Sequence, residues 1–426
     1  MGSTALLTDH YELTMLDAAL RDSTAERHCV FEVFARRLPD GRRYGVVAGT
    51  ARLLEAIRDF TFDADTVRRL HENGVVSETA ADYLADYRFR GDVDGYSEGE
   101  LYFPYSPLVT VSGTFAEAVI LETLTLSVLN HDTAIASAAA RMVNAAEGRP
   151  VIEMGSRRTH EEAAVAAARA AYLAGFASTS NLAAGDRYGV PTAGTAAHAF
   201  TLLHDDEAAA FRAQVAAVGS DTTLLVDTYD LTQGIATAVE VAGPSLGAIR
   251  IDSGDLGVLA RQARQQLDDL GAPNTRIIVS GDLDEYSIAA LGTSPVDAYG
   301  AGTAVVTGSG APTASMVYKL VEVDGRPVAK RSEHKATQGG RKTAYRAHKP
   351  TGTAVEEVVV AGPSPELGEH DRLLQRPLMR GGSPVPELPT LDESREHLRR
   401  AMVTLPWDGL KLSRGEPAVP TRVVTT

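Results

Sequence analysis

The middle of the chain alternates short apolar runs with longer amphipathic segments. Each run has four or five residues, as expected of strands buried on both faces of a parallel sheet. The predicted strands are 151–154, 175–179, 190–193, 223–226, 248–251, 276–279 and 296–299. Helical patterns lie between most of them, at 159–175, 207–218 and 256–270, and Thr159 with Glu162 predicts a capping box for the first. Seven βα-like units in about 150 residues predict a closed or nearly closed barrel.

A polar or glycine-containing cluster follows each predicted strand. These clusters are 155–158, 180–181, 194–198, 227–230, 252–255, 280–282 and 300–303. In βα barrels the active site is assembled at the carboxyl ends of the strands. Although loops are often polar for other reasons, seven consecutive clusters predict one site at this end of the barrel.

The two ends of the chain show a different pattern. A helix is predicted from Asp9, strands at 30–34 and 100–103, and helices at 115–129 and 131–147. Alternation returns near 316–318 and 355–360, a Pro/Gly-rich stretch covers 361–390, and a last helix is predicted at 391–402. The fold class is therefore α/β, an irregular βα barrel at 149–315 with a flanking α+β domain built from 1–148 and 316–426.

The amino-acid composition limits the kinds of molecule that the protein is expected to bind. The net charge is −15, which disfavours non-specific binding to nucleic acid or to a membrane surface. Cys29 is the single cysteine, so no internal disulfide forms. The first residues lack the pattern of a signal peptide, and no apolar run is long enough for a membrane span. A cytoplasmic protein without nucleic-acid or membrane partners is expected.

Three features suggest phosphate chemistry. Arg250 and Asp252 lie two residues apart, so both lie on one face of a strand, where they could hold phosphate and Mg²⁺ or could form a buried ion pair. The late glycine clusters, 280–282 and 300–303, could cradle a phosphate with backbone N–H groups. Between 325 and 350, eight Lys and Arg stand against one acid, a pattern that suits either a solvated loop or a polyphosphate clamp.

His198 ends the cluster after the third predicted strand. A lone histidine is more often structural than catalytic. Here small residues precede it, and Asp227 and Asp230 follow the next strand. An imidazole oriented by a carboxylate such as Asp227 could act as a nucleophile toward a phosphoryl group.

At this point the chain resembles the nicotinate phosphoribosyltransferases, of the type II phosphoribosyltransferase fold. The similar segments are LTDHYELTM (7–15), EMGSRR (153–158), GTAAHAF (194–200), LVDTYD (225–230), RIDSGDL (250–256), SGDLDEY (280–286), GAGT (300–303), VYKL (317–320) and KRS (330–332). They occur in order and span about residues 5 to 400, so together they are specific.

The resemblance implies an irregular barrel beside an α+β domain, in a head-to-tail homodimer with shared active sites. It places the base between Tyr11 of one subunit and the loop at Met154 of the other, where the family usually has phenylalanine. Ser180 stands where the nicotinamide-using relatives carry aspartate, and a hydroxyl suits the carboxylate of nicotinate.

The resemblance also implies the reaction: nicotinate, phosphoribosyl pyrophosphate, ATP and water give nicotinate mononucleotide, pyrophosphate, ADP and phosphate, in NAD salvage. His198 would be the phosphohistidine, with Asp227 and Asp252 as catalytic residues, and Mg²⁺ bound through water at Asp252. The implied substrate-binding residues, besides Tyr11, Met154 and Ser180, are Arg157, Thr195, Arg250, Ser280, Gly281, Asp282, Gly302 and Thr303. The candidates for contact with ATP or phosphate are Lys319, Lys330 and Arg331.

Other activities remain as alternatives. Nicotinamide or quinolinate could replace nicotinate within the same fold. A dinucleotide-binding oxidoreductase would need a G-x-G-x-x-G turn, but position 305 is Val after Gly300 and Gly302. A non-catalytic binding module would leave the polar strand ends without a purpose.

Overall fold

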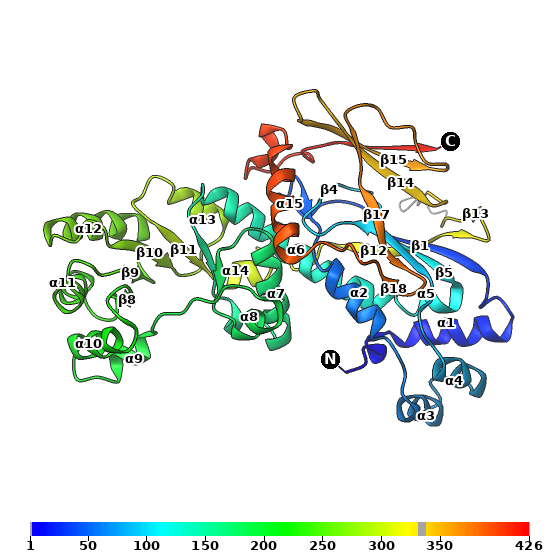
Figure 1. Cartoon of the computed structure of the whole chain (residues 1–426), viewed down its shortest axis with the longest axis horizontal. Coiled ribbons are helices and arrows are strands. Elements are labelled where there is room, and N and C mark those ends of the chain that lie inside the picture. Colours follow the sequence, from blue (N-terminus) through cyan, green and yellow to red (C-terminus); the bar gives the residue numbers. More distant parts are fainter. Residues whose placement is uncertain (1, 331–337, 426) are drawn as a thin grey trace. The chain divides into compact units, whose positions relative to one another are not determined.

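A computed structural model of the chain describes residues 2–330 and 338–425. The chain forms two compact units (Figure 1). The flanking unit combines Met1–Ser137 with Ala311–Thr426, and the barrel unit is Ala138–Gly310. The division falls within one helix, α6 (Glu122–Ala145), and each unit is described by itself below.

The barrel unit contains a curled parallel sheet of six strands in the order β7-β6-β11-β10-β9-β8. The strands are β6 (Val151–Glu153), β7 (Ser178–Thr179), β8 (Thr223–Leu225), β9 (Ala248–Ile251), β10 (Arg276–Ser280) and β11 (Ala298–Ala301). Thr192 adds a single parallel bridge beside Thr179. Most apolar side chains of these strands are buried, and Ile249 and Val279 are fully so. The irregular barrel is confirmed as a half-barrel, and the predicted strand at 190–193 is reduced to that bridge.

Helices connect the strands of the barrel unit. They are η2 (Ser156–Arg158), α7 (Glu161–Leu173), α8 (Leu182–Tyr188), α9 (His198–Leu202), α10 (Glu207–Val218), α11 (Leu231–Ala242), α12 (Leu256–Asp269), α13 (Glu285–Ala290) and α14 (Thr303–Val306). Helices α10, α11 and α12 follow one another along one side of β8–β10 (Figure 1). The predicted capping box at Thr159 is wrong: the N-cap of α7 is His160, whose Nδ1 accepts a hydrogen bond from the Glu162 N–H at 3.3 Å.

The described residues of the flanking unit form three sheets. The largest has the order β13-β12-β1-β5-β3-β17-β18, a second has β16-β14-β15-β19, and β2 pairs with β4. The strands are β1 (His28–Ala35), β2 (Gly45–Val46), β3 (Asp92–Tyr96), β4 (Leu101–Tyr102), β5 (Val109–Thr114), β12 (Met316–Val323), β13 (Arg326–Pro327), β14 (Lys342–His348), β15 (Ala354–Ala361), β16 (Asp371–Leu373), β17 (Gln375–Arg380), β18 (Ser383–Pro384) and β19 (Thr421–Thr425). The central pairs β1–β5 and β1–β12 are antiparallel, so residues far apart in sequence form one sheet.

Helices pack around these sheets. They are η1 (Ala5–Leu7), α1 (His10–Arg21), α2 (Thr50–Arg58), α3 (Ala64–Glu72), α4 (Glu78–Ala85), α5 (Phe115–Val119), α15 (Leu391–Val403) and η3 (Trp407–Leu410). The predicted division into helices at 115–129 and 131–147 is wrong. Since neither Gly nor Pro occurs between residues 122 and 145, α6 continues through residue 130, and the break lies between α5 and α6 instead. Among the helices that the structure describes, none has the length and apolar character to cross a membrane.

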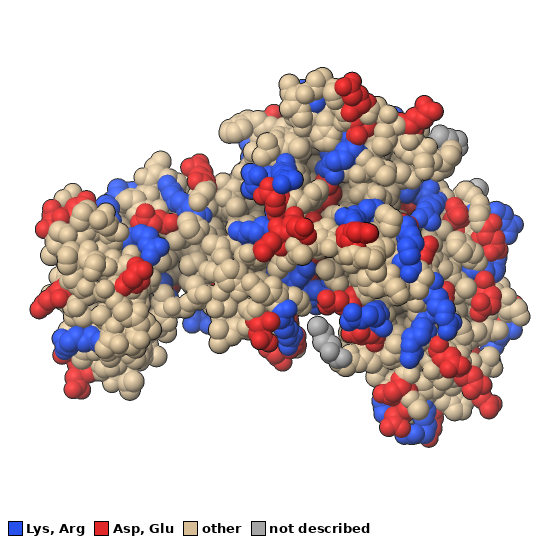
Figure 2. Space-filling model, in the orientation of Figure 1, with Lys and Arg blue, Asp and Glu red and all other residues tan. Residues whose placement is uncertain are grey.

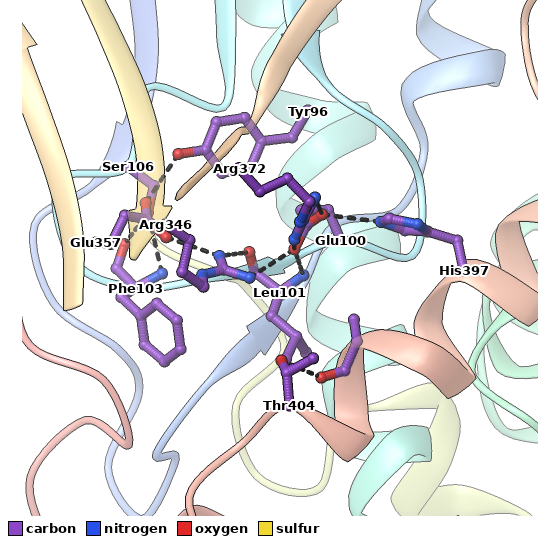
Figure 3. Close-up of polar contacts among 11 residues, drawn as sticks. Tyr96, Glu100, Leu101, Phe103, Ser106, Arg346, Glu357, Arg372, His397 and Thr404 are labelled. Atoms are coloured by element: carbon purple, nitrogen blue, oxygen red, sulfur yellow. Dashed lines mark hydrogen bonds and ion pairs between the residues drawn. The ribbon is translucent and has the colours of Figure 1, made fainter. Parts of the chain in front are cut away.

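A buried ionic network joins the strands of the flanking unit (Figure 3). Arg346 on β14 contacts Glu100 at 2.6 Å and Glu357 at 2.7 Å, and its side chain is 1% exposed. Glu100 also pairs with Arg372 and, at 2.8 Å, with His397 on α15. Burial alone would raise the pKa of Glu100, but the neighbouring cations hold that pKa well below its usual range. The network therefore ties α15 to the sheets through the buried Glu100 carboxylate, while its partners His397 and Arg372 remain partly exposed.

Candidate functional site

A cleft of about 460 Å³ opens at the carboxyl ends of the strands in the barrel unit. It is lined by Met154, Ser156, Arg157, Arg158, Ser180, Ala193, Gly194, Thr195, Ala196, Ala197, Arg250, Asp252, Ser280, Gly281, Asp282, Gly300, Gly302 and Thr303. Every polar cluster predicted after a strand, except 227–230, contributes to this lining. The site lies where parallel βα folds place their active sites.

The structure brings together most of the residues that the sequence singled out. Those in the cleft are Met154, Arg157, Ser180, Thr195, Arg250, Asp252, Ser280, Gly281, Asp282, Gly302 and Thr303. His198 and Asp227 lie beside the cleft, through contacts with Asp252. Tyr11, Lys319 and Lys330 belong to the flanking unit, and Arg331 lies outside the described residues.

Arginine side chains bring positive charge to the cleft of an otherwise acidic protein. Arg250 projects from β9, and its Nη1 donates a hydrogen bond to Thr195 Oγ1 at 2.5 Å. Its Nε is buried and has no hydrogen-bond partner among the described residues. Burial is the main cause of a lowered Arg250 pKa, and the nearby charge of Arg157 acts in the same direction. Two guanidinium groups that line the same cleft suit a phosphate or pyrophosphate.

On the face of the molecule that Figure 2 shows, the basic side chains do not form a cluster. There, Lys and Arg side chains are interspersed with Asp and Glu. The chain has 41 basic and 56 acidic residues, so an anionic substrate gains from a locally basic pocket. Arg157, Arg158 and Arg250 provide that local charge.

Glycines let backbone atoms approach each other in the cleft. Gly281 has a φ of 109°, and a Cβ there would lie 2.4 Å from the carbonyl oxygen of Asp252. A Cβ at Gly300 would lie 2.8 Å from Sδ of Met154. Asp282, which follows Gly281, has a φ of 47°, and this value is uncommon for a residue with a side chain. The turn after β10 is thus specified by glycine and exposes its backbone to a ligand.

Asp252, like Asp282, contributes a carboxylate to the cleft. Its Oδ1 accepts a hydrogen bond from Ser280 Oγ, and its side chain is 30% exposed. Arg250 and Asp252 form no ion pair with each other among the described interactions, so the buried-pair alternative is wrong. In the described part of the chain no group of three or more potential metal ligands occurs. One exposed carboxylate fits a Mg²⁺ ion that is coordinated chiefly by substrate phosphates and water.

His198 is the first residue of α9 and is 40% exposed. Its Nε2 lies 4.0 Å from Asp252 Oδ2, and its Nδ1 lies 3.1 Å from Thr228 Oγ1. The prediction that Asp227 orients the imidazole is therefore wrong. The Asp227 carboxylate turns the other way, where Oδ2 accepts hydrogen bonds from Asp252 N at 2.8 Å and Ser253 Oγ at 3.0 Å. This leaves Nε2 as the ring nitrogen directed at Asp252, a residue of the cleft.

The opposite wall of the cleft is fixed by Glu153, at the end of β6. The buried Glu153 carboxyl accepts hydrogen bonds from the Gly155 N–H and from Thr179 Oγ1, and burial raises its pKa. It thereby joins the loop that carries Met154 to the strand that precedes Ser180. Asn181 adds a second link, because its Nδ2 donates to Ser156 Oγ at 3.0 Å.

Sequence reasoning assigned no role to several residues that shape this site. Thr228, Ser156, Arg158 and Asn181 were not singled out, although each belongs to one of the polar clusters after a strand. The cluster pattern was the available signal. The choice among members of a cluster depends on side-chain direction, which the pattern does not contain.

The predicted residues of the flanking unit have surroundings of their own. Tyr11, on α1, is 45% exposed, and partial burial together with Glu122 and Glu12 raises its pKa to about 12. Lys319, on β12, is half-buried and acts electrostatically on Glu122. Lys330 is exposed.

Comparison with known proteins agrees with this arrangement. Residues 6–130 match the nicotinate phosphoribosyltransferase N-terminal domain, and residues 135–310 match the quinolinate phosphoribosyl transferase C-terminal domain. The chain is 65% identical to nicotinate phosphoribosyltransferase pncB1 of Mycobacterium tuberculosis, over 98% of this chain and 95% of the relative. The nicotinate phosphoribosyltransferase of Bacillus subtilis is 36% identical, over 81% of this chain and 73% of the relative.

Solved structures show the same fold. Human nicotinic acid phosphoribosyltransferase superposes with a TM-score of 0.84 at 25% identity, covering 98% of this chain and 97% of that chain. Nicotinate-nucleotide pyrophosphorylase from Pyrococcus furiosus superposes with a TM-score of 0.79 at 26% identity, covering 93% and 94%. The chain belongs to the nicotinate phosphoribosyltransferase family.

Proposed function

We propose that this enzyme joins nicotinate to the ribose of phosphoribosyl pyrophosphate and couples that step to ATP hydrolysis, as part of NAD salvage. Family membership supports the reaction. The observation that carries the proposal for this chain is the convergence of Arg157, Arg158 and Arg250 on one cleft whose turns are built from glycine. Such a cleft suits a substrate that carries a phosphate and a pyrophosphate.

The base lies against the wall formed by Met154 and Ser180. Met154 offers an apolar, polarisable contact for a pyridine ring. Ser180 offers a hydroxyl to the carboxylate of nicotinate, and no charge repels it there. A carboxylate at the same position would disfavour the acid and suit the amide.

Transfer then follows from charge. The pyridine nitrogen attacks the anomeric carbon, the bond from that carbon to pyrophosphate breaks, and positive charge develops on the ribose. Arg250 and Arg157 hold the leaving pyrophosphate, and Thr195 orients Arg250 through its hydroxyl. Mg²⁺, associated with Asp252 and the phosphates, would neutralise part of the pyrophosphate charge.

ATP acts through His198. Nε2 attacks the γ-phosphorus, ADP leaves, and water later removes the phosphoryl group as inorganic phosphate. Thr228 supports this role because its hydroxyl, 3.1 Å from Nδ1, can fix the tautomer that leaves Nε2 unprotonated. Lys319, Lys330 and Arg331 are further candidates for contact with ATP or phosphate.

We further propose a homodimer in which Tyr11 completes the site of a second copy. An exposed aromatic side chain is available for stacking on the base. Mixing Tyr11→Ala with Arg250→Ala subunits should restore activity in hybrid dimers, whereas neither variant alone is active. No recovery after confirmed subunit exchange contradicts the shared site.

The direct test is a product assay by liquid chromatography. Purified enzyme is given phosphoribosyl pyrophosphate and Mg²⁺ with nicotinate, nicotinamide or quinolinate, each with and without ATP. We expect nicotinate mononucleotide to form and ATP to stimulate its formation. Quinolinate is included because residues 135–310 match a quinolinate enzyme domain. Comparable kcat/KM for either other base contradicts the proposed specificity.

A further inference from the structure

Two carboxyl groups of the barrel unit each have a buried oxygen without a hydrogen-bond partner among the described residues. These atoms are Asp227 Oδ1 and Glu207 Oε1. Glu207 is the first residue of α10 and is 9% exposed. An ionised carboxylate buried without donors is unfavourable, so the pair calls for a proton, a water or a cation.

The surroundings of Glu207 favour the proton. Burial raises the Glu207 pKa to about 7, and the charges of Asp227 and then Asp230 act in the same direction. No cation among the described residues acts on Glu207, and no group of three potential metal ligands occurs in the described part of the chain. A carboxylic acid carries an O–H donor, and Asp227 Oδ1 is a buried acceptor that lacks one.

The packing of α11 keeps this region closed. A Cβ at Gly234 would lie 2.2 Å from the carbonyl oxygen of Val226 and 3.3 Å from Glu207 Oε2. Only glycine lets α11 approach the end of β8 and the Glu207 carboxyl this closely. The absence of a side chain at residue 234 therefore leaves room for the Glu207 carboxyl near Val226, the residue before Asp227, whose charge acts on Glu207.

Asp227 links this pair to the site. Its second oxygen accepts hydrogen bonds from Asp252 N at 2.8 Å and Ser253 Oγ at 3.0 Å. Asp252 lies in the cleft, 4.0 Å from His198 Nε2. Rotation of the Asp227 carboxylate would break both hydrogen bonds to the turn that carries Asp252.

We propose that Glu207 is a positioning residue for the proposed reaction: its carboxylic acid donates a hydrogen bond to Asp227 Oδ1 and fixes the carboxylate that holds the turn at Asp252. The effect on turnover rests on the proposed function. The hydrogen bond is a property of the fold and can be tested without substrate.

The first experiment detects the acid directly. Infrared difference spectra of the substrate-free enzyme, wild type minus Glu207→Gln, are recorded between about pH 5.5 and about pH 9. We expect a protonated carboxyl C=O band that disappears as the pH rises through about 7. Glu161→Gln is the matched control, because Glu161 is also the first residue of a helix but is exposed. A spectrum without the acid band at the lowest pH overturns the proposal, since a bridging water or cation leaves both groups ionised.

The second experiment measures turnover. Glu207→Gln keeps a hydrogen-bond donor, so its kcat/KM at pH 6 should stay within about twofold of wild type. Any decline of kcat/KM that begins near pH 7 in the wild-type enzyme should be absent from this variant. Glu207→Ala should lower kcat by about tenfold with a smaller change in the KM for nicotinate, since one buried hydrogen bond is lost away from the base. Circular dichroism and melting temperature confirm that each variant folds.

Two outcomes of the turnover assay overturn the positioning role. One is Glu207→Ala with the kcat and pH profile of wild type, and the other is Glu207→Gln as impaired as Glu207→Ala. If the wild-type enzyme makes no nicotinate mononucleotide, the proposed function fails, and the infrared result alone decides the hydrogen bond.

Discussion

Gly281→Ala is the sharpest perturbation of the cleft that changes no charge. Gly281 follows β10 with a φ of 109°, in a region that residues with a side chain rarely adopt. The added Cβ would lie 2.4 Å from the carbonyl oxygen of Asp252, well inside van der Waals contact. Since the carbonyl is part of the backbone, the strain cannot be relieved by a side-chain rotation, and one of the two turns must move.

The expected loss of activity follows from the strained backbone at residue 281 and from the close contact with the Asp252 carbonyl oxygen. Unfavourable backbone geometry of this kind costs about 1–3 kcal/mol. Movement of the turn displaces the Asp252 carboxylate relative to its Ser280 and His198 neighbours. A misplacement of about 1 Å at a reacting centre can cost on the order of 100-fold, so we expect kcat/KM to fall by about 10- to 100-fold.

A second glycine separates strain from displacement. Gly271, in the turn after α12, also has a positive φ of 72°, but a Cβ there meets no atom within 4 Å. Gly271→Ala should therefore lower the melting temperature slightly and leave kcat/KM unchanged. Steady-state kinetics and thermal melts of both variants make the comparison. Wild-type kcat/KM in Gly281→Ala, or an equal loss in Gly271→Ala, refutes the reasoning.

Three further predictions concern other links of the argument. His198→Ala should abolish ATP hydrolysis and the acid-labile, alkali-stable label from γ-labelled ATP, yet keep slow ATP-independent transfer; equal labelling of the variant contradicts the phosphohistidine. Ser180→Asp should lower kcat/KM for nicotinate by about tenfold or more through like charge, and an unchanged value places the base elsewhere. Arg346→Met should destabilise the flanking unit by about 3–5 kcal/mol, measured as a lower melting temperature. Arg422→Met should change the melting temperature little, because the side chain of Arg422 is 54% exposed in its ion pair. The pKa of Glu100 in the folded protein lies below its unfolded value of about 4.3, so the stability that Glu100 contributes is present above that pH and is lost as the pH falls further. In Arg346→Met the melting temperature should therefore fall less steeply than in wild type as the pH is lowered.

The barrel unit was predictable from sequence because its signal is local. A parallel strand covered on both faces is a short, mostly apolar run, and the strands at 248–251 and 276–279 were found on that basis within one residue. Their polar ends marked the cleft in advance, since all parallel strands end at the same edge. The run at 190–193 looks the same in sequence, but it adds only the bridge at Thr192.

The flanking unit was less predictable because most of its strand pairs are antiparallel and join segments that lie far apart in the sequence. Strand β3 reads DVDGY and β17 reads QRPLMR, so neither is an apolar run, yet the two pair across more than 270 residues. The sequence also did not reveal which polar side chains contact each other. Asp227 and Thr228 are neighbours in sequence, and only the direction of each side chain decides that Thr228 meets His198.

Glu207 shows how a local explanation can conceal a role that the fold creates. In sequence it is an acidic residue in the first turn of a helix, a position where the helix dipole stabilises a carboxylate by about 0.3–1 kcal/mol. In the structure, burial and Asp227 raise its pKa to about 7. A pKa change of one corresponds to about 1.4 kcal/mol, so the environment outweighs the dipole and favours the acid. The same carboxyl group that stabilises a helix as an anion elsewhere is thus suited here to act as a hydrogen-bond donor, and only the position of Asp227 in the fold makes the difference.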